Sequence, residues 1–404
     1  MSRFGTHLPY PSTPASDMKA VAVLAAFLHD GRAAAAPDYT ANTLTAPESY
    51  ACHTAANPSP VHFDAFCSEA GCWPALWLLG AQKAATTSTI DLFENCGITS
   101  QAYITEEDAA PCPVNIPCKE THAFVTPETQ CAKNKTIACD LVRNVTSSYT
   151  GAFDLSTCAE RLSSHQEPYY APYAPAEWRT AACSAGRFID ATPSSGTQKF
   201  PAELFRLMPE GMKLQARFAL ILREPVERML SWYNHQVASG LIASTMTFAA
   251  YSEQQLSREF ETGFYVDFIE LFVAAGWARS QLLVLGFDEL TDSTAAAMQR
   301  LTTHFGTPVL VDSPELPVSN SHDSAAKVVS IACTTRAQLD ATYAPYNERL
   351  YARLAEDRTR GLAPALETAM APFELRLPCG QSESTMATES ANGGVVSAKR
   401  ARWL

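Results

Sequence analysis

The sequence has no long hydrophobic run and no excess of basic residues. Hydrophobic residues make up 47% of the 404 positions. Even so, no segment approaches the roughly 20 consecutive apolar residues that a transmembrane helix needs. Acidic residues outnumber basic ones by 42 to 30, which gives a formal net charge of −12. A general nucleic-acid-binding protein needs a basic surface for phosphate contacts, so this balance argues against that class. The apolar content suffices for a sizeable core, which excludes a globally disordered chain.

Lysine is also scarce, because only 9 of the 30 basic residues are lysines. A lysine inside a motif therefore stands out. The sequence has no Gly-Lys-[Ser/Thr] end of a Walker A loop, which a magnesium-dependent nucleotide kinase would need. It also has no cluster of carboxylates that would hold a metal. We therefore expect no metal cofactor.

The cysteines lack the CxxC-and-histidine spacing of zinc sites. Ten of them, an even number, cluster between residues 52 and 183. Such a cluster predicts disulfides formed in an oxidising compartment. Two Asn-x-Thr sequons, at Asn134 and Asn144, lie in the same region and predict glycosylation. We therefore expect a protein of the secretory pathway, either lumenal or secreted. The other two of the 12 cysteines, Cys333 and Cys379, stand apart from this cluster.

The N-terminal region has the composition of a leader or stem up to about residue 70. Lys19 precedes an apolar run at 20–28, and small residues follow at 33–36. This pattern fits a signal peptide and equally a short buried helix. We expect one domain over 71–380, with a cysteine-rich insert at 96–187. A polar, disordered tail over 381–404 would follow it. Nothing in the sequence indicates an oligomeric state.

Apolar and helical segments alternate from about residue 74 onward. This alternation predicts an α/β fold, with a mostly parallel central sheet flanked by helices. Ligands of such sheets bind beyond the carboxyl ends of the strands. Segments 80–88 and 223–231 follow two strands and are therefore candidate sites. The expected strands are 75–79, 217–222 and 282–285. Four helices are expected. The first begins near Thr87, and the second lies within 259–275. The third runs from an Asp292 cap to Phe305, before Gly306, and the fourth covers 336–354 with an interruption at Pro345.

The first candidate site, Gly80–Ser88, reads GAQKAATTS. It follows a strand and leads into a helix, whose first N–H groups and dipole favour an anion. Lys83 and three hydroxyls add further donors. A phosphate or sulfate would fit such a loop. The alternative is a capped helix with a solvated lysine.

The second candidate site, Leu222–Ser231, reads LREPVERMLS. Arg223 leaves a buried strand where its planar guanidinium can grip a phosphate. Ser231 lies two helical turns further on and can reach the same region. The alternative is that Arg223 pairs with Glu227 as a structural clamp. We expect Arg228 to make such a clamp.

Together the two motifs resemble those of Golgi-type sulfotransferases that use PAPS (3'-phosphoadenosine 5'-phosphosulfate), closest to the heparan sulfate branch. The motifs of that family read G-x-x-K-G-G-T-[TR]-[SA]-L and L-R-[DN]-P-V-E-R-A-x-S. The resemblance covers about 74–354 and includes 188–194 and 343–350. It implies a phosphate-binding loop, PAPS as co-substrate and no metal. The implied cofactor-binding residues are Lys83, Ala84, Ala85, Thr86, Thr87, Ser88, Arg223 and Ser231.

A third segment, 119–124, reads KETHAF and resembles the K-E-x-H-F-F segment of the same branch. The resemblance implies that Glu120 is the catalytic base and that Lys119 and His122 contact substrate. Lys83 would act on the leaving phosphate. The implied reaction moves a sulfuryl group from PAPS to a hydroxyl or amine of a glycan or small-molecule acceptor. The alternative for this segment is an exposed Lys-Glu pair in a disulfide loop.

The sequence departs from the family pattern in two places. Ala84 and Ala85 replace paired glycines, and alanine fits there if its φ stays negative. This replacement keeps open a catalytically weak, cysteine-rich secreted binding protein on a sulfotransferase scaffold. The late Cys…Lys-Gly-Arg loop of the heparan branch is also missing. Lys327 or Arg336 is a candidate substitute for it.

Overall fold

The computed structural model describes residues 53–55, 61–68, 71–96, 98–101, 187–191, 199–256, 263–312, 316, 331–373 and 379–380. All of them belong to one compact unit, 46–404. The candidate residues Lys119, Glu120, His122, Asn134 and Asn144 lie outside the described residues. So do most of the cysteine-rich insert, the apolar run near the N-terminus and the tail.

The centre of the fold is a five-stranded sheet in the order β5-β6-β4-β7-β8. Every neighbouring pair in it is parallel. The expected α/β fold with a parallel central sheet is therefore confirmed. The strands of this sheet are β4 (Leu76–Leu78), β5 (Ser100–Gln101), β6 (Phe188–Asp190), β7 (Arg217–Leu222) and β8 (Leu282–Gly286).

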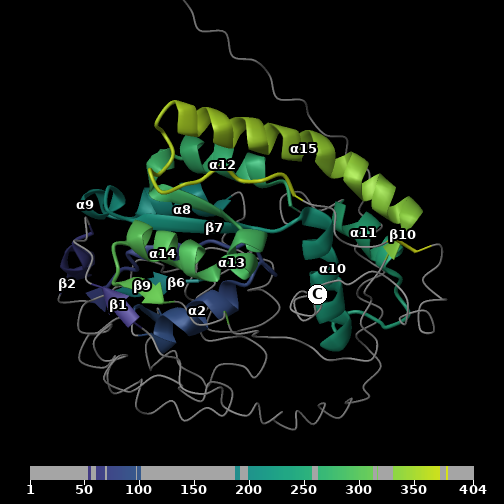
Figure 1. Cartoon of the computed structure of the whole chain (residues 1–404), viewed down its shortest axis with the longest axis horizontal. Helices are drawn as coiled ribbons and strands as arrows, with labels where there is room; N and C mark the ends of the chain where they lie inside the picture. The colour runs from purple at the N-terminus through teal and green to yellow at the C-terminus, as the bar shows by residue number, and fades with distance from the viewer. Residues whose placement is uncertain are drawn as a thin grey trace, which may run out of the picture. The chain divides into compact units, whose positions relative to one another are not determined.

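Helices cover both faces of the sheet. In Figure 1, α12 and α15 lie on one side of β7, and α14 and α2 lie on the other. The α-helices are α2 (Thr86–Asn95), α8 (Lys199–Leu207), α9 (Glu210–Lys213), α10 (Pro225–Ala238), α11 (Phe248–Leu256), α12 (Tyr265–Ala274), α13 (Phe287–Asp292), α14 (Thr294–Phe305) and α15 (Cys333–Thr359). Two short 3₁₀ helices, η2 (Phe63–Phe66) and η5 (Arg279–Gln281), complete the set in the described residues.

The middle of the sheet is buried because helices enclose it on both sides. Phe218 of β7 stacks on Trp77 of β4, with ring centroids 6.4 Å apart. The ring of Phe218 also packs edge-on against the rings of Trp277 and of Phe272 in α12, with centroid distances of 4.7 Å and 5.0 Å. Continuous apolar runs at 76–79 and 218–222 supply this core. They also fix the strand ends at which the candidate site begins.

In the described residues, two small antiparallel strand pairs lie outside the main sheet. Strand β1 (His53–Ala55) pairs antiparallel with β9 (Val309–Asp312), and β2 (Cys67–Ser68) pairs with β3 (Gly71–Cys72). Phe66, in the segment expected to be a leader or stem, packs into the main core. Among the described helices, none is long and apolar enough to cross a membrane.

Two helix boundaries differ from the sequence expectations. Asp292 is the last residue of α13 and does not cap α14, whose N-cap is Ser293. Helix α15 continues through Pro345, where an interruption was expected. Packing on both sides of the proline explains this, because Tyr343 and Leu350 are both buried. The predicted stop at Gly306 is confirmed, since Gly306 closes α14 with a left-handed φ of 65°.

A disulfide joins the two cysteines that stood apart in the sequence. Cys333 begins α15 and bonds to Cys379, with Cα atoms 4.7 Å apart. Their neighbours form the parallel pair β10 (Ile331–Ala332) and β11 (Cys379–Gly380). The chain segment after α15 is therefore fastened back to the start of that helix.

A buried ionic group holds the segment after α15 near the beginning of β8. Arg279 pairs with Asp357 at 2.9 Å and with Glu367 at 2.7 Å, and all three side chains are buried. Glu367 also accepts a hydrogen bond from the backbone N–H of Val284. Burial raises the pKa of Glu367 above its ordinary value, although Arg279 opposes that shift. Each buried charge has an opposite partner, as burial of ions requires.

Candidate functional site

The loop between β4 and α2 is held by the adjacent strand β7. Beyond the end of β4, Ala81 donates its N–H to the carbonyl of Ile221 at 2.7 Å. Ile221 in turn donates to the carbonyl of Gly80, also at 2.7 Å. The first residues of the loop are thus fixed one residue before the end of β7. This pairing brings the two sequence motifs together at the carboxyl edge of the sheet.

Two residues of this loop have left-handed backbone conformations. The φ of Lys83 is 67° and that of Ala85 is 63°. A negative φ was the condition for alanine at both positions, and this is wrong for Ala85. Such conformations cost non-glycine residues about 1–3 kcal/mol each and persist where the surroundings impose them, which is common at functional sites. The loop therefore has, at an alanine, a backbone conformation that glycine adopts most readily.

The start of α2 suits an anion. Its first turn contains no acidic residue, and Thr86 and Ser88 are buried there. The hydroxyl of Thr89 donates to the carbonyl of Ala85 at 2.9 Å, which ties the loop to the helix. The N–H groups of a helix's first turn lack partners within the helix, and its dipole favours negative charge. A phosphate or sulfate fits this set of donors together with Lys83.

Arg223 links β7 to this loop. Its side chain is only 2% exposed, and its Nη1 donates to the backbone carbonyl of Lys83 at 2.9 Å. Its Nε lies 3.8 Å from Glu227, which is the clamp that the sequence analysis gave as an alternative. The guanidinium also lies over the ring of Phe287 at 4.5 Å. Burial lowers the pKa of Arg223, and Glu227 opposes that shift. In this structure Arg223 positions the lysine loop directly.

The carbonyl of Arg223 is also engaged. The hydroxyl of Tyr265, at the start of α12, donates to it at 2.7 Å. Burial raises the pKa of Tyr265 to about 12, so its hydroxyl stays protonated and remains a donor. Gly263 comes close to Pro225 at the same place, and a Cβ there would lie 2.8 Å from the proline Cβ. Helix α12 therefore packs directly on the beginning of α10.

Glu224 caps α10 with its own carboxylate. It accepts hydrogen bonds from the N–H groups of Val226 at 3.1 Å and Glu227 at 2.8 Å, and Pro225 occupies the first turn. Burial raises the pKa of Glu224 to about 7, although nearby Arg336 and the two N–H donors oppose that shift. The N-terminus of α10 is thus already occupied by a negative group. An anionic ligand would find its donors in the loop before α2.

The next part of α10 brings an aromatic pair toward the lysine. Ser231 is 8% exposed, and the next residue, Trp232, has its ring 5.9 Å from the Nζ of Lys83. Trp232 also stacks on His235 at 5.1 Å. Neither residue was predicted from the sequence. Their i,i+3 spacing within α10, directly after Ser231, was the available signal.

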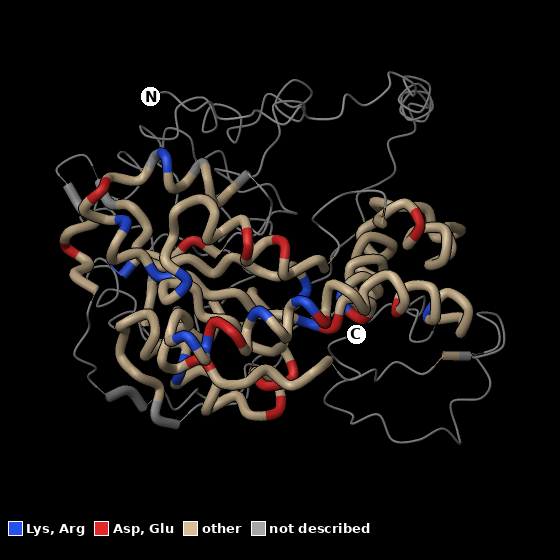
Figure 2. Tube along the Cα trace, turned by 90° about the horizontal axis from the view of Figure 1, so that it is seen from above, with Lys and Arg blue, Asp and Glu red and all other residues tan. Residues whose placement is uncertain are grey.

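The structure places Lys83 beside Arg223 and beside Trp232, the residue that follows Ser231. The binding roles of Lys83, Arg223 and Ser231 stay predictions. Arg228 is buried, and the clamp expected for it stays a prediction. Within the described ranges, no group of three or more His, Cys, Asp or Glu side chains is arranged to hold a metal ion. In Figure 2, basic and acidic positions of the Cα trace lie close together at several places.

Comparison with known proteins agrees with the motifs. Residues 195–336 match the family model described as "Sulfotransferase domain". The match includes Arg223, Ser231 and Arg336, whereas Lys83 lies before it. It supports the sulfotransferase family and sulfuryl transfer in general. Among solved structures, the chain is similar to a sulfotransferase from Alicyclobacillus acidocaldarius at 16% identity. That similarity covers 70% of this chain and 96% of the other, with a TM-score of 0.41. No curated protein matches the chain.

Proposed function

We propose that the chain is a PAPS-dependent sulfotransferase of the Golgi type, close to the heparan sulfate branch. It would move a sulfuryl group to a hydroxyl or amine of a glycan or small-molecule acceptor. The observation that carries the proposal is the Lys83 loop. It is paired to β7, held by Arg223 at 2.9 Å, and followed by a helix start without acidic residues.

The residues of the loop fit the donor's phosphosulfate. The N–H groups and hydroxyls of Thr86, Thr87 and Ser88 would bind its oxygens. Arg223 and Ser231 would hold the 3'-phosphate at the side of the site formed by α10. PAPS, when bound, supplies a sulfuryl group whose transfer breaks the bond from sulfur to the bridging phosphate oxygen.

Two residues of the chain would act on the reacting groups. Lys83 would stabilise the negative charge that develops on the leaving oxygen, or donate a proton to it. Glu120 would take the proton of the acceptor hydroxyl as that oxygen attacks sulfur. Lys119 and His122 would contact the acceptor. Trp232 borders Lys83 and would keep its ammonium beside the loop.

The test is transfer of labelled sulfate from PAPS onto a panel of glycans and small alcohols. We expect transfer by the wild type and loss of transfer in Lys83→Ala. The affinity of that variant for PAP, the desulfated product of PAPS, should be reduced but measurable. Glu120→Gln should bind PAP like the wild type and lose about 10²–10⁴-fold in turnover. Near-normal turnover in either variant would remove that residue from its proposed role.

A thermal-shift measurement with PAP separates this proposal from the binding-protein alternative. An enzyme with an intact donor site should be stabilised as PAP rises above its dissociation constant. No stabilisation at millimolar PAP would favour a degenerate scaffold. The positive φ of Ala85 argues for an intact loop, because the turn survives the replacement of glycine.

We also propose that the protein works in the Golgi lumen or is secreted. The cysteine cluster and the two sequons in the sequence support this compartment, and so does the disulfide between Cys333 and Cys379. Occupancy of Asn134 and Asn144, measured by mass shift after glycosidase treatment, tests the proposal. Unmodified asparagines in protein from a eukaryotic secretory host would contradict the glycosylation.

A further inference from the structure

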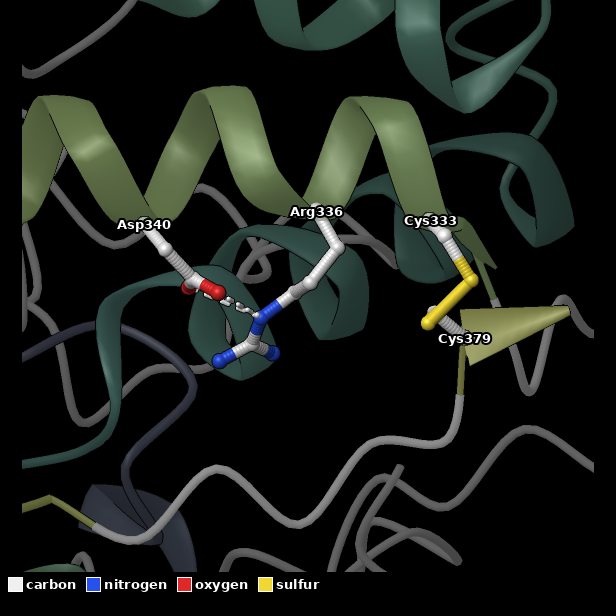
Figure 3. Close-up of a disulfide and its surroundings, with 4 residues drawn as sticks. All are labelled: Cys333, Arg336, Asp340 and Cys379. Atoms are coloured by element: carbon white, nitrogen blue, oxygen red, sulfur yellow. Dashed lines mark hydrogen bonds and ion pairs between the residues drawn. A yellow bond between two sulfur atoms is a disulfide. The ribbon is translucent and has the colours of Figure 1, made fainter.

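Arg336 connects α15 to the beginning of α10. Figure 3 shows its side chain extending away from α15, about one turn beyond Cys333. The side chain is 7% exposed, and its Nη2 lies 3.5 Å from the Oε1 of Glu224. On its own helix, its Nε donates to Asp340 at 3.0 Å. Arg336 is therefore a buried cation held between carboxylates of two helices.

A short series of contacts leads from Arg336 to the lysine loop. Glu224, the partner of Arg336, caps α10 through the N–H groups of Val226 and Glu227. The residue before Glu224 is Arg223, whose guanidinium donates to the carbonyl of Lys83. The place of Glu224 thus sets the direction in which Arg223 leaves β7. Arg336 is thus connected to the loop through Glu224 and Arg223.

The disulfide fixes the turn of α15 that carries Arg336. Cys333 is three residues before Arg336 and is bonded to Cys379. The pairing of β10 with β11 adds a backbone connection at the same point. The first turn of a helix otherwise frays easily, because its N–H groups lack partners within the helix. The covalent bond and the strand pair restrain that motion here.

We propose that Arg336 is a positioning residue for the donor loop. It holds Glu224 at the cap of α10, and Glu224 in turn aligns Arg223 with the carbonyl of Lys83. The Cys333–Cys379 disulfide supports this function by fixing the turn on which Arg336 lies. The inference rests on the proposed function, because it concerns the affinity of the same loop for the sulfate donor.

The physical reason is the burial of Glu224. Without Arg336, its carboxylate would lie in a buried place with its main opposite charge removed. Such a group takes up a proton or turns toward water, and either change weakens the cap of α10. Arg223 would then lose its fixed starting point. Small displacements of binding groups are expensive at sites that depend on exact geometry.

The experiment measures PAP affinity by calorimetry in four proteins. They are the wild type, Arg336→Met, Arg336→Lys and the control Arg349→Met. Arg349 lies on the same helix and pairs with Asp267 and Glu270 of α12, away from Glu224. We expect Arg336→Met to weaken PAP binding by about 10- to 100-fold, the range for residues that orient binding groups. Arg336→Lys should recover most of the affinity, and Arg349→Met should bind like the wild type.

A double-mutant cycle with Glu224→Gln shows whether Arg336 acts through Glu224. In the Glu224→Gln background, Arg336→Met should have little further effect on PAP affinity. The double variant leaves no unpaired buried carboxylate, so it serves the comparison if Arg336→Met alone does not fold. In turnover, Arg336→Met should raise the KM for PAPS more than the KM for the acceptor. A purely structural role would move both and would not depend on Glu224.

The disulfide is tested by replacing both of its cysteines with serine. We expect PAP binding to weaken in the same direction as in Arg336→Met, and the affinity of the Arg336→Met variant to change little when the disulfide is also removed. Additive effects in either cycle, or an Arg336→Met affinity equal to that of Arg349→Met, would overturn the inference while PAP still binds the wild type. Failure of the wild type to bind PAP would contradict both this inference and the proposed function.

Discussion

Ala85 illustrates how one backbone angle decides the meaning of a motif mismatch. The resembling family has glycine at this position, and alanine here takes a φ of 63°. The neighbouring Ala84 has no positive φ and is completely buried. The two alanines therefore replace two glycines under different physical conditions. Only Ala85 carries backbone strain.

Restoring glycine one position at a time should give opposite results. Ala85→Gly relieves a strain of about 1–2 kcal/mol and adds about 0.4–1 kcal/mol of unfolded-chain entropy, so stability should be unchanged or slightly higher. Ala84→Gly has no strain to relieve and should destabilise the fold by about 1 kcal/mol. Urea unfolding of the two variants measures the difference. An equal loss in both would show that Ala85 is not strained.

At the scale of an element, α15 passes through an exposed proline without a break. Pro345 has no N–H to donate and crowds the preceding turn, which costs a helix interior about 3 kcal/mol. Leu350 and Tyr343 on either side are buried, and Arg349 pairs with two carboxylates of α12. The packing of α15 on the rest of the domain therefore outweighs the local cost.

Replacing this proline should stabilise the protein. Pro345→Ala restores a helical hydrogen bond and also frees the unfolded chain, so we expect a net gain of about 1–2 kcal/mol. Gln338→Ala, on an exposed part of the same helix, serves as the control and should change stability by less than about 0.5 kcal/mol. Melting temperatures of both variants give the answer. A loss of stability in Pro345→Ala would mean that the proline shapes a bend that the packing needs.

How much the sequence foretold depends on where each element's signal lies. The strands β7 and β8 were predictable because both are continuous apolar runs. Gly306 was predictable as a helix end because glycine readily adopts the left-handed φ found there. The course of α15 was not, because contacts from distant residues decide it. The proposed roles of Lys83 and Arg223 came from their two motifs and from the family that these motifs resemble. Their mutual hydrogen bond, and the part of Arg336, depend on strand register and helix packing, which local sequence does not encode.

At the scale of the whole molecule, two buried groups give opposite pH dependences of stability. The pKa of Glu224 is raised to about 7, so between pH 4.5 and 7 the folded state holds a proton that the unfolded chain has released. Its contribution to stability therefore falls as pH rises through that window. Burial lowers the pKa of His304 to about 4, while its ring nitrogen donates to the carbonyls of Phe218 and Gln281. Its contribution rises with pH between about 4 and 6.5.

The two contributions should partly cancel between about pH 4.5 and 6.5. Unfolding by urea across this range should show a flatter profile for the wild type than for single variants. Glu224→Gln should lose stability on acidification relative to the wild type, because His304 is then the only one of these two groups that titrates. His304→Gln keeps a donor for the two carbonyls and should gain stability on acidification. Variant profiles parallel to that of the wild type would contradict these assignments.

The ionic group around Arg279 also has a consequence for synthesis. Arg279 lies just before β8, but its partners Asp357 and Glu367 are translated 78 and 88 residues later. A nascent chain that has placed β8 in the sheet thus holds an uncompensated cation until nearly the whole domain has left the ribosome. Since burial of an unpaired charge costs several kcal/mol, truncated products lacking Glu367 should stay incompletely folded and be open to proteolysis. Stable folding of the domain therefore requires these late residues, and the disulfide between Cys333 and Cys379 can form only after they have been translated.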